Sequence, residues 1–512
     1  MLPPDVFTPI LELAISRDGP SDVDSNFYPF NDVHELLNIT SVCRQWREMA
    51  LTSPSLWKYI PTDLHEDLLV LFVQRSADSL LHIRLTHKVF RDWEPDRRSQ
   101  ELALSKFALL IPHLHRTRFL SLTLSTFTIY KLDTELITSH CDLPALEVLQ
   151  FHTNGVLTIR PPVAVEEALR ESALSLMEKF GMPVIRGLHF TGISIPASSI
   201  TSNSISYLSL TVNGASSGLR SYLCDVFGRC ESLVSLSLNI WRDGILMGFA
   251  PPATPSSQIL ELPHLRRLAL KGICNQCLFV SRMLRTPSLR EVCLDIGSSS
   301  FEGAIQVVPL TTLGNCLSVK ADSEEIHMEF TNSCGGTRKG TDFTVIIRGT
   351  LPVSYLSSAR LVTLLEPRTF PEVEIMDYTT PYIYDKTFLP SLFPRFPNLR
   401  SLHIRYTDIK RKFPIDDAFN LKLLVQTVGK RSAASLRNLV LEGFEVIMPT
   451  ASPFFIELSS IPRWRRSLRL APFVAEFRNC DGFSDSTLRA SGLEREGSSV
   501  MMSSDDKARF TT

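Results

Sequence analysis

Two stretches of the sequence share one spacing of apolar residues: Leu-Pro-His-Leu-Arg-Arg-Leu-Ala-Leu at 262–270 and Phe-Pro-Asn-Leu-Arg-Ser-Leu-His-Ile at 396–404. In each, a leucine precedes two other residues, a second leucine, one other residue and a final apolar residue. The last two apolar positions alternate with a polar or small residue, which predicts a short strand with one buried face.

Further copies of this spacing occur on both sides of these stretches, and within the regular parts their first residues lie from 20 to 39 positions apart. Segments able to form helices, such as 219–227 and 277–284, lie between the copies. A strand and a helix repeated side by side predict a stacked repeat architecture. The other copies are Leu80-Ile83-Leu85, Phe119-Leu122-Leu124, Ile185-Leu188-Phe190, Ile205-Leu208-Leu210, Leu233-Leu236-Leu238, Leu289-Val292-Leu294 and Leu436-Leu439-Leu441, with a partial copy at Leu146 and Leu149.

This pattern resembles an irregular leucine-rich repeat. The Asn that normally follows the repeat strand occurs only at Asn213, and other residues take the equivalent place elsewhere. Residues 300–395 follow the spacing poorly, and residues 343–348 have the composition of an edge strand in a hairpin. The resemblance implies an α/β fold: a curved solenoid with a parallel strand face, interrupted around 300–395.

The first sixty residues follow a different, helical pattern. Asp32 and Glu35 have the spacing of a capping box at a helix start. The apolar residues behind them fall at steps of three and four, which predicts one helix of about five turns: Leu36, Ile39, Cys43, Trp46 and Ala50. Pro54 should end this helix and begin a short new one. A cluster this small would leave large apolar side chains exposed unless another surface covers them.

In order and spacing, residues 2–57 resemble an F-box: Leu2-Pro3-Pro4-Asp5-Val6-Phe7 with Ile10-Leu11, then Leu36-Leu37, then Val42-Cys43-Arg44-Gln45-Trp46-Arg47, then Pro54-Ser55-Leu56-Trp57. In that family a three-helix unit binds the Skp-type adaptor of a cullin–RING ubiquitin ligase. The resemblance implies that the adaptor-binding residues are Leu2, Pro3, Ile10, Leu11, Leu36, Leu37, Val42, Cys43, Trp46, Pro54, Leu56 and Trp57.

Two features depart from the family pattern: a polar insertion over 16–30, and Pro9 inside the first helix, where it removes a hydrogen bond. They support an alternative in which the chain is a repeat scaffold with a vestigial F-box that binds no adaptor.

The residues between the buried leucines should form the target-binding surface on the strand face. They are Arg267, Lys271, Glu291, Asp295, Ser401, His403, Arg405 and Glu442. Their mixed charges favour a protein partner over a polyanion.

The sequence therefore predicts three regions. Residues 1–60 form the F-box helical domain, and residues 61–478 form the irregular repeat solenoid. Residues 479–512 form a disordered tail, because Ser, Asp, Arg and Gly dominate after Cys480. The expected function is substrate recognition in an SCF-type ubiquitin ligase. The chain would hold a target close to the ubiquitin-charged enzyme and perform no bond chemistry itself.

Motifs for catalysis and cofactors are weak. Residues 214–218 fit G-x-S-x-G, but the oxyanion segment of an esterase is missing, so an esterase using Ser216 is the least favoured alternative. Cys274 and Cys277 form a lone CxxC without the second pair that zinc needs. No phosphate-binding glycine motif occurs, and no metal or cofactor is expected.

The composition restricts partners and compartment. Lys and Arg number 53 against 54 Asp and Glu, so no basic excess points to nucleic acid or a membrane surface. The start of the chain lacks the pattern of a signal peptide, and the longest dense apolar run, 68–73, is far shorter than the roughly 20 residues that span a bilayer. The ten scattered cysteines do not resemble a disulfide framework. We expect an intracellular protein, cytoplasmic or nuclear or both.

Overall fold

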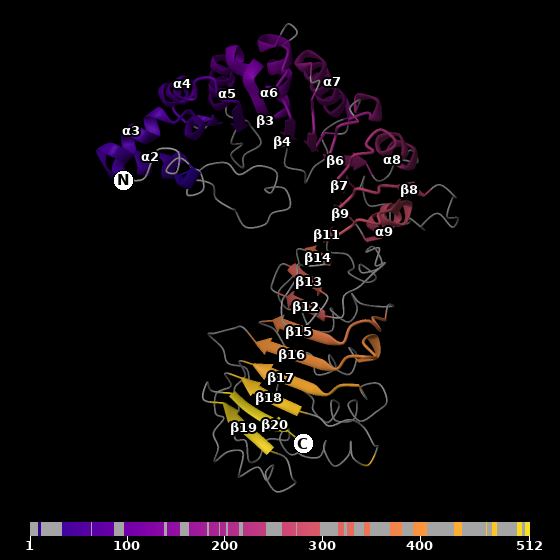
Figure 1. Ribbon diagram of the computed structural model, residues 1–512. Helices are drawn as coiled ribbons and strands as arrows, with labels where there is room; N and C mark the ends of the chain where they lie inside the picture. The colour runs from indigo at the N-terminus through magenta and orange to yellow at the C-terminus, as the bar shows by residue number, and fades with distance from the viewer. Residues whose placement is uncertain are drawn as a thin grey trace. The chain divides into compact units, whose positions relative to one another are not determined.

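The computed structural model describes residues 9–11, 33–62, 64–86, 97–137, 141–153, 163–181, 184–193, 195–200, 203–213, 219–241, 259–272, 274–296, 316–321, 325–331, 343–348, 369–380, 393–406, 435–442, 467, 474–478, 499–503 and 507–511. The chain divides into two compact units. The first comprises Met1–Leu246 with Leu262–Leu265, and the second comprises Met247–Glu261 with Arg266–Thr512. Both units are built mainly on parallel strands, so the fold class is mixed α/β (Figure 1).

The N-terminal helical segment consists of α2 (Val33–Val42), α3 (Arg44–Thr52) and the 3-10 helix η2 (Pro54–Trp57). The predicted single helix is wrong, because the backbone becomes extended at Cys43, with φ −156° and ψ 168°. Thr40 and Ser41 donate side-chain hydrogen bonds to carbonyls three residues earlier, which competes with helical bonding. The Cys43 sulfur then caps α3 by accepting a bond from the Trp46 N–H at 3.4 Å.

The strands of the first unit follow one another in chain order, and each pairs in parallel with the next. They are β1 (Tyr59–Pro61), β2 (Leu81–Thr86), β3 (Thr117–Leu124), β4 (Val148–Thr153), β5 (Gly187–Thr191), β6 (Tyr207–Asn213) and β7 (Ser235–Trp241). The connecting helices lie on the outer side of this row of strands (Figure 1). They are α4 (Glu66–Arg75), α5 (Arg97–Leu110), η3 (Ile111–Arg116), α6 (Thr126–Lys131), η4 (Leu132–Leu136), α7 (Val163–Phe180), η5 (Ala197–Ser199) and α8 (Leu219–Phe227).

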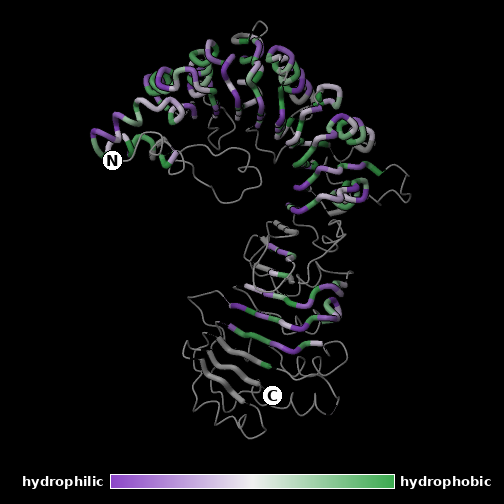
Figure 2. The backbone as a smooth tube through the Cα atoms, in the orientation of Figure 1, coloured by the Kyte–Doolittle hydropathy of each residue, from purple (hydrophilic) through white to green (hydrophobic). Residues whose placement is uncertain are grey.

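The strand register stacks the repeated apolar residues in two buried rows. One row contains Leu120, Leu149, Leu188, Leu208 and Leu236, and the other contains Leu122, Phe151, Phe190, Leu210 and Leu238. The predicted copy beginning at Phe119 is therefore two residues out of register. β3 is buried at consecutive positions, so its sequence fits the apolar spacing in two frames, and the prediction chose the wrong one. Figure 2 shows the alternation of hydrophobic and hydrophilic residues along the strands.

The second unit contains β9 (Arg267–Gly272) and β11 (Glu291–Ile296), which pair in parallel. Three strands follow in reversed spatial order: β14 (Phe343–Arg348) beside β11, then β13 (Glu325–Thr331), then β12 (Cys316–Ala321) beside the next repeat strand. Residues 343–348 are thus an interior strand, which corrects their prediction as an edge strand. A small parallel pair, β8 (Leu260–Glu261) with β10 (Leu284–Arg285), and helix α9 (Cys274–Met283) also belong here.

Parallel pairing resumes with β15 (Ile375–Thr380), β16 (Ser401–Tyr406), β17 (Asn438–Glu442) and β18 (Val474–Arg478). The 3-10 helix η8 (Phe393–Arg395) precedes β16. β15 is a copy of the spacing that the sequence analysis missed, because Val373, Met376 and Tyr378 replace the leucines. All three are buried, and Met376 and Tyr378 are in register with Leu402 and Ile404.

Within the predicted disordered tail, the structure describes residues 499–503 and 507–511, and both segments are strands. β19 (Ser499–Ser503) and β20 (Lys507–Thr511) form an antiparallel pair, and β20 also pairs with β18. The sequence of each strand alternates apolar and polar residues, as Val500 and Met502 illustrate, and this short signal was outweighed by the polar composition around it.

Candidate functional site

The N-terminal helices carry large apolar side chains at their surface. Val42 at the end of α2 is 60% exposed and Ile10 is 46% exposed. Cys43 and Pro54 are also exposed, whereas Leu37 and Trp46 are half-buried. These six residues belong to the predicted adaptor-binding set, and they are available to a partner. Leu2 and Pro3 lie outside the described residues.

Four other residues of the predicted set are buried inside the unit: Leu11, Leu36, Leu56 and Trp57. The Trp57 indole N–H donates to the Ala50 carbonyl at 2.7 Å, and its ring packs edge-on against Phe72 of α4 at 4.9 Å. Trp57 therefore joins η2 to α3 and α4. The small helical cluster was expected to need another surface over its large apolar side chains, and α4 provides that contact for Trp57.

The predicted target-binding residues of β9 and β11 pair with one another across the two strands. Arg267 lies 3.0 Å from Glu291, and Lys271 lies 2.6 Å from Asp295, measured between side-chain nitrogen and oxygen. The strand register places both pairs directly opposite each other. Each positive charge is paired with a carboxylate, so these four residues form a surface patch without net charge.

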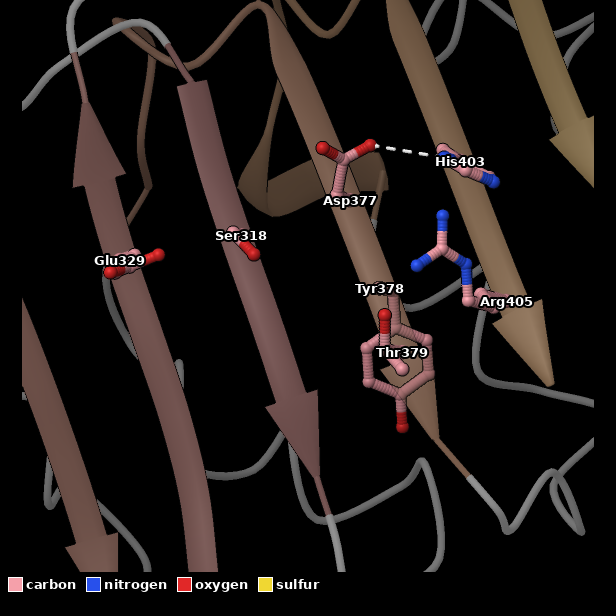
Figure 3. Close-up of a pocket in the computed structure, with 7 residues that line it drawn as sticks. All are labelled: Ser318, Glu329, Asp377, Tyr378, Thr379, His403 and Arg405. Atoms are coloured by element: carbon pink, nitrogen blue, oxygen red, sulfur yellow. Dashed lines mark ion pairs between the residues drawn. The ribbon is translucent and has the colours of Figure 1, made fainter. Parts of the chain in front are cut away.

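The predicted residues of β16 and β17 converge on one carboxylate. Glu442 Oε2 lies 2.9 Å from His403 Nε2 and 3.0 Å from Arg405 Nε. The other His403 ring nitrogen, Nδ1, lies 3.4 Å from the Asp377 carboxylate of β15 (Figure 3). Ser401, at the start of β16, is half-buried and does not line the pocket described below.

Opposing effects act on the pKa of Glu442. Burial raises it, but the hydrogen bond and positive charge of Arg405, together with those of His403, outweigh burial and lower the pKa. Glu442 therefore stays ionised, and its pairing contributes stability above the usual carboxyl pKa that is lost as the pH falls through the lowered value.

Beside this cluster is a pocket of about 210 Å³, lined by Ser318, Glu329, Asp377, Tyr378, Thr379, His403 and Arg405 (Figure 3). Of these seven residues, His403 and Arg405 were predicted from the sequence, and the other five were not. Those five lie on β12, β13 and β15, where the leucine spacing fails. The alternation around Asp377, with buried Met376 and Tyr378 on either side, was the available signal.

The strand face of the first unit has a different polar character, with His189 buried and His152 half-buried on neighbouring strands. The rings of His152 and His189 lie 4.4 Å apart, and His189 Nε2 is 2.7 Å from the Thr191 hydroxyl. Burial lowers the pKa of His189 to about 4, so this side chain is neutral at physiological pH. The sequence spacing did not predict this pair, because the two histidines become neighbours only through the register of β4 and β5.

The remaining sequence motifs add no chemistry to these surfaces. Ser216 and the motif around it lie outside the described residues, and Cys277 is buried in α9. Within the part of the chain that the structure describes, no three His, Cys, Asp or Glu side chains are grouped to hold a metal ion. None of the described helices is both long and apolar enough to cross a membrane. No protein-family profile matches the sequence, and a comparison with curated proteins finds no relative.

Proposed function

We propose that the chain is a substrate-recognition adaptor of a cullin–RING ubiquitin ligase. Its N-terminal helices bind the Skp-type adaptor, and an irregular leucine-rich-repeat solenoid binds a target protein. The chain catalyses no reaction itself. It raises the effective concentration of the target beside the ubiquitin-charged enzyme, which is sufficient for selective transfer.

The observation that carries the proposal is the exposure of Val42 within the F-box-like block of residues 42–47. Val42 lies at the junction of α2 and α3, and Cys43 is exposed beside it, so neighbouring apolar side chains are offered to a partner at this point. Covering the exposed part of a Val side chain stabilises a complex by about 1 kcal/mol. Leu37 and Trp46, both half-buried, add apolar surface on the same helical segment.

Burial of Trp57 determines which variants make a clean test. Truncating a fully buried Trp typically costs about 3–5 kcal/mol of folding free energy, so loss of binding by such a variant would be ambiguous. Val42→Asp combined with Trp46→Ala instead alters residues that are exposed or half-buried. Leu102→Asp is the matched control, because Leu102 is a similarly exposed apolar residue, 48% exposed on α5.

The experiment is capture of purified Skp-type adaptor by the full-length chain, measured with both variants. We expect the unmodified chain and Leu102→Asp to bind equally and the Val42→Asp, Trp46→Ala variant to lose at least about tenfold in affinity. Failure of the unmodified chain to bind would refute the adaptor role and favour the repeat scaffold with a vestigial F-box.

A further inference from the structure

Four polar residues that line the pocket of the second unit occupy one row across four neighbouring strands. Ser318 on β12 is opposite Glu329 on β13 and also opposite Asp377 on β15, and Asp377 is opposite His403 on β16. Figure 3 shows these side chains on the same face, with Thr379 and Arg405 in the next row. The pocket is therefore built by the sheet itself and not by loops.

The row has two carboxylates with a small residue between them. Adjacent strands lie about 4.8 Å apart, so Glu329 and Asp377 are separated by roughly twice that distance. The Ser318 side chain is too short to fill the space between them. An elongated group that enters above Ser318 would have a carboxylate on each side and hydroxyl groups of Ser318 and Thr379 below it.

The charges around the pocket are unequal. Arg405 is already paired with Glu442, and His403 lies between Glu442 and Asp377. Among the side chains that the structure describes, Glu329 forms no ion pair. Among the described side chains, the three carboxylates of Glu329, Asp377 and Glu442 face the single guanidinium of Arg405 and the imidazole of His403, so negative charge is in excess. The pocket therefore favours a cation.

We propose that this pocket binds a Lys or Arg side chain of the target protein. The proposal rests on the target-binding role given to the strand face above, and it adds the chemistry of the bound segment. A phosphate or carboxylate ligand is disfavoured, because the guanidinium of Arg405 is already engaged by Glu442. A metal ion is disfavoured because Ser318 holds the two carboxylates too far apart for the ~2.0–2.6 Å bonds that a bound cation of this kind requires.

The test uses the full-length chain and two fluorescein-labelled peptides with the same Gly-Ser frame, one carrying three Arg residues and the other three Glu residues. Fluorescence anisotropy at low ionic strength measures binding. We expect the Arg peptide to bind at least about tenfold more tightly than the Glu peptide, and added salt to weaken it. Absence of binding by the Arg peptide, or tighter binding by the Glu peptide, would overturn the proposal.

Variants that remove a carboxylate and a variant that removes the guanidinium test whether the peptide binds in this pocket. Glu329→Gln and Asp377→Asn should each weaken the Arg peptide about threefold to tenfold, whereas Arg405→Gln, which removes a competing cation, should strengthen it. Glu372→Gln is the matched control, because Glu372 is exposed in the turn before β15 and does not line the pocket. Equal effects of Glu329→Gln and Glu372→Gln would contradict the assignment. Circular dichroism checks folding, and Asp377→Asn tests the same pocket independently.

The two proposals fail separately. Adaptor capture depends on the N-terminal helices and does not involve Glu329 or Asp377. Peptide binding without adaptor capture would leave a cation-binding repeat scaffold, whereas adaptor capture without peptide binding would leave the ligase role and remove the Lys or Arg preference.

Discussion

Acidification should destabilise the first unit through its buried histidines. His189 is 5% exposed, and burial lowers its pKa from 6.5 to about 4. In the unfolded chain the same imidazole returns to its ordinary value. Between these two values the unfolded state binds more protons than the folded state, so stability is complete above about pH 6.5 and falls as the pH approaches 4.

The size of the effect follows from the two pKa values. At pH 4.5 the unfolded side chain is almost fully protonated, while the folded one is mostly neutral. This difference lowers the free energy of unfolding by about 2.5 kcal/mol relative to pH 7.5. A loss of this size is a substantial part of the roughly 5–15 kcal/mol by which domains are normally stable. His82 adds to it, because burial and the charges of Lys58 and Arg118 lower its pKa to about 4 as well.

The assay is urea unfolding followed by circular dichroism between pH 7.5 and pH 4.5, for the unmodified chain, His189→Gln and His264→Gln. Gln cannot take up a proton, so the His189→Gln variant should lose about 2.5 kcal/mol less over this range, whatever its stability at pH 7.5. His264 is exposed in a turn, so the His264→Gln variant is the matched control for a histidine replaced outside the buried face. Parallel curves for the unmodified chain and His189→Gln would refute the reasoning, because His189 would then accept a proton in the folded state without penalty.

Three further predictions concern packing and reactivity. An added Cβ at Gly187 would lie 2.9 Å from Val148 Cγ2, so Gly187→Ala should cost about 1–3 kcal/mol in thermal unfolding, and Val148→Ala should remove most of that cost when combined with it. Trp57→Phe keeps one aromatic ring in this position but removes the second ring and the indole donor to the Ala50 carbonyl, for an expected loss of about 1–3 kcal/mol by urea unfolding; an unchanged midpoint would contradict the role of Trp57 in joining η2 to α3 and α4. Burial raises the pKa of the Cys230 thiol to about 11, so mass spectrometry after iodoacetamide treatment at pH 8 should find it unmodified in the folded chain, and rapid alkylation would disprove its enclosure.

The repeat strands were predictable where the apolar spacing is local and unambiguous. Leu188 with Phe190, and Leu402 with Ile404, mark strands directly, because two apolar residues separated by one polar residue fit one buried face. At β3 the consecutive apolar residues allowed two frames, and pairing with β4 selected the one that the sequence analysis did not choose. The break at Cys43 depends on side-chain bonds from Thr40 and Ser41, which a helical spacing pattern does not register.

The pocket was only half predictable. His403 and Arg405 follow from their places between buried residues of a recognisable repeat. Glu329 and Ser318 reach the pocket because β12, β13 and β14 fill the space between β11 and β15 in reverse order. Such a neighbourhood depends on long-range strand pairing, and no local pattern in the sequence specifies it.

The reversed order of β12, β13 and β14 also governs how the second unit can assemble. β11 pairs with β14, yet Ile296 and Phe343 are separated by 47 positions in the chain. During synthesis at about 5–20 residues per second, the free edge of β11 waits roughly 2–10 s for its partner. An unpaired strand edge is a template for pairing with another chain. During this interval the nascent protein is therefore exposed to misassociation, and a chaperone that shields strand edges would help it.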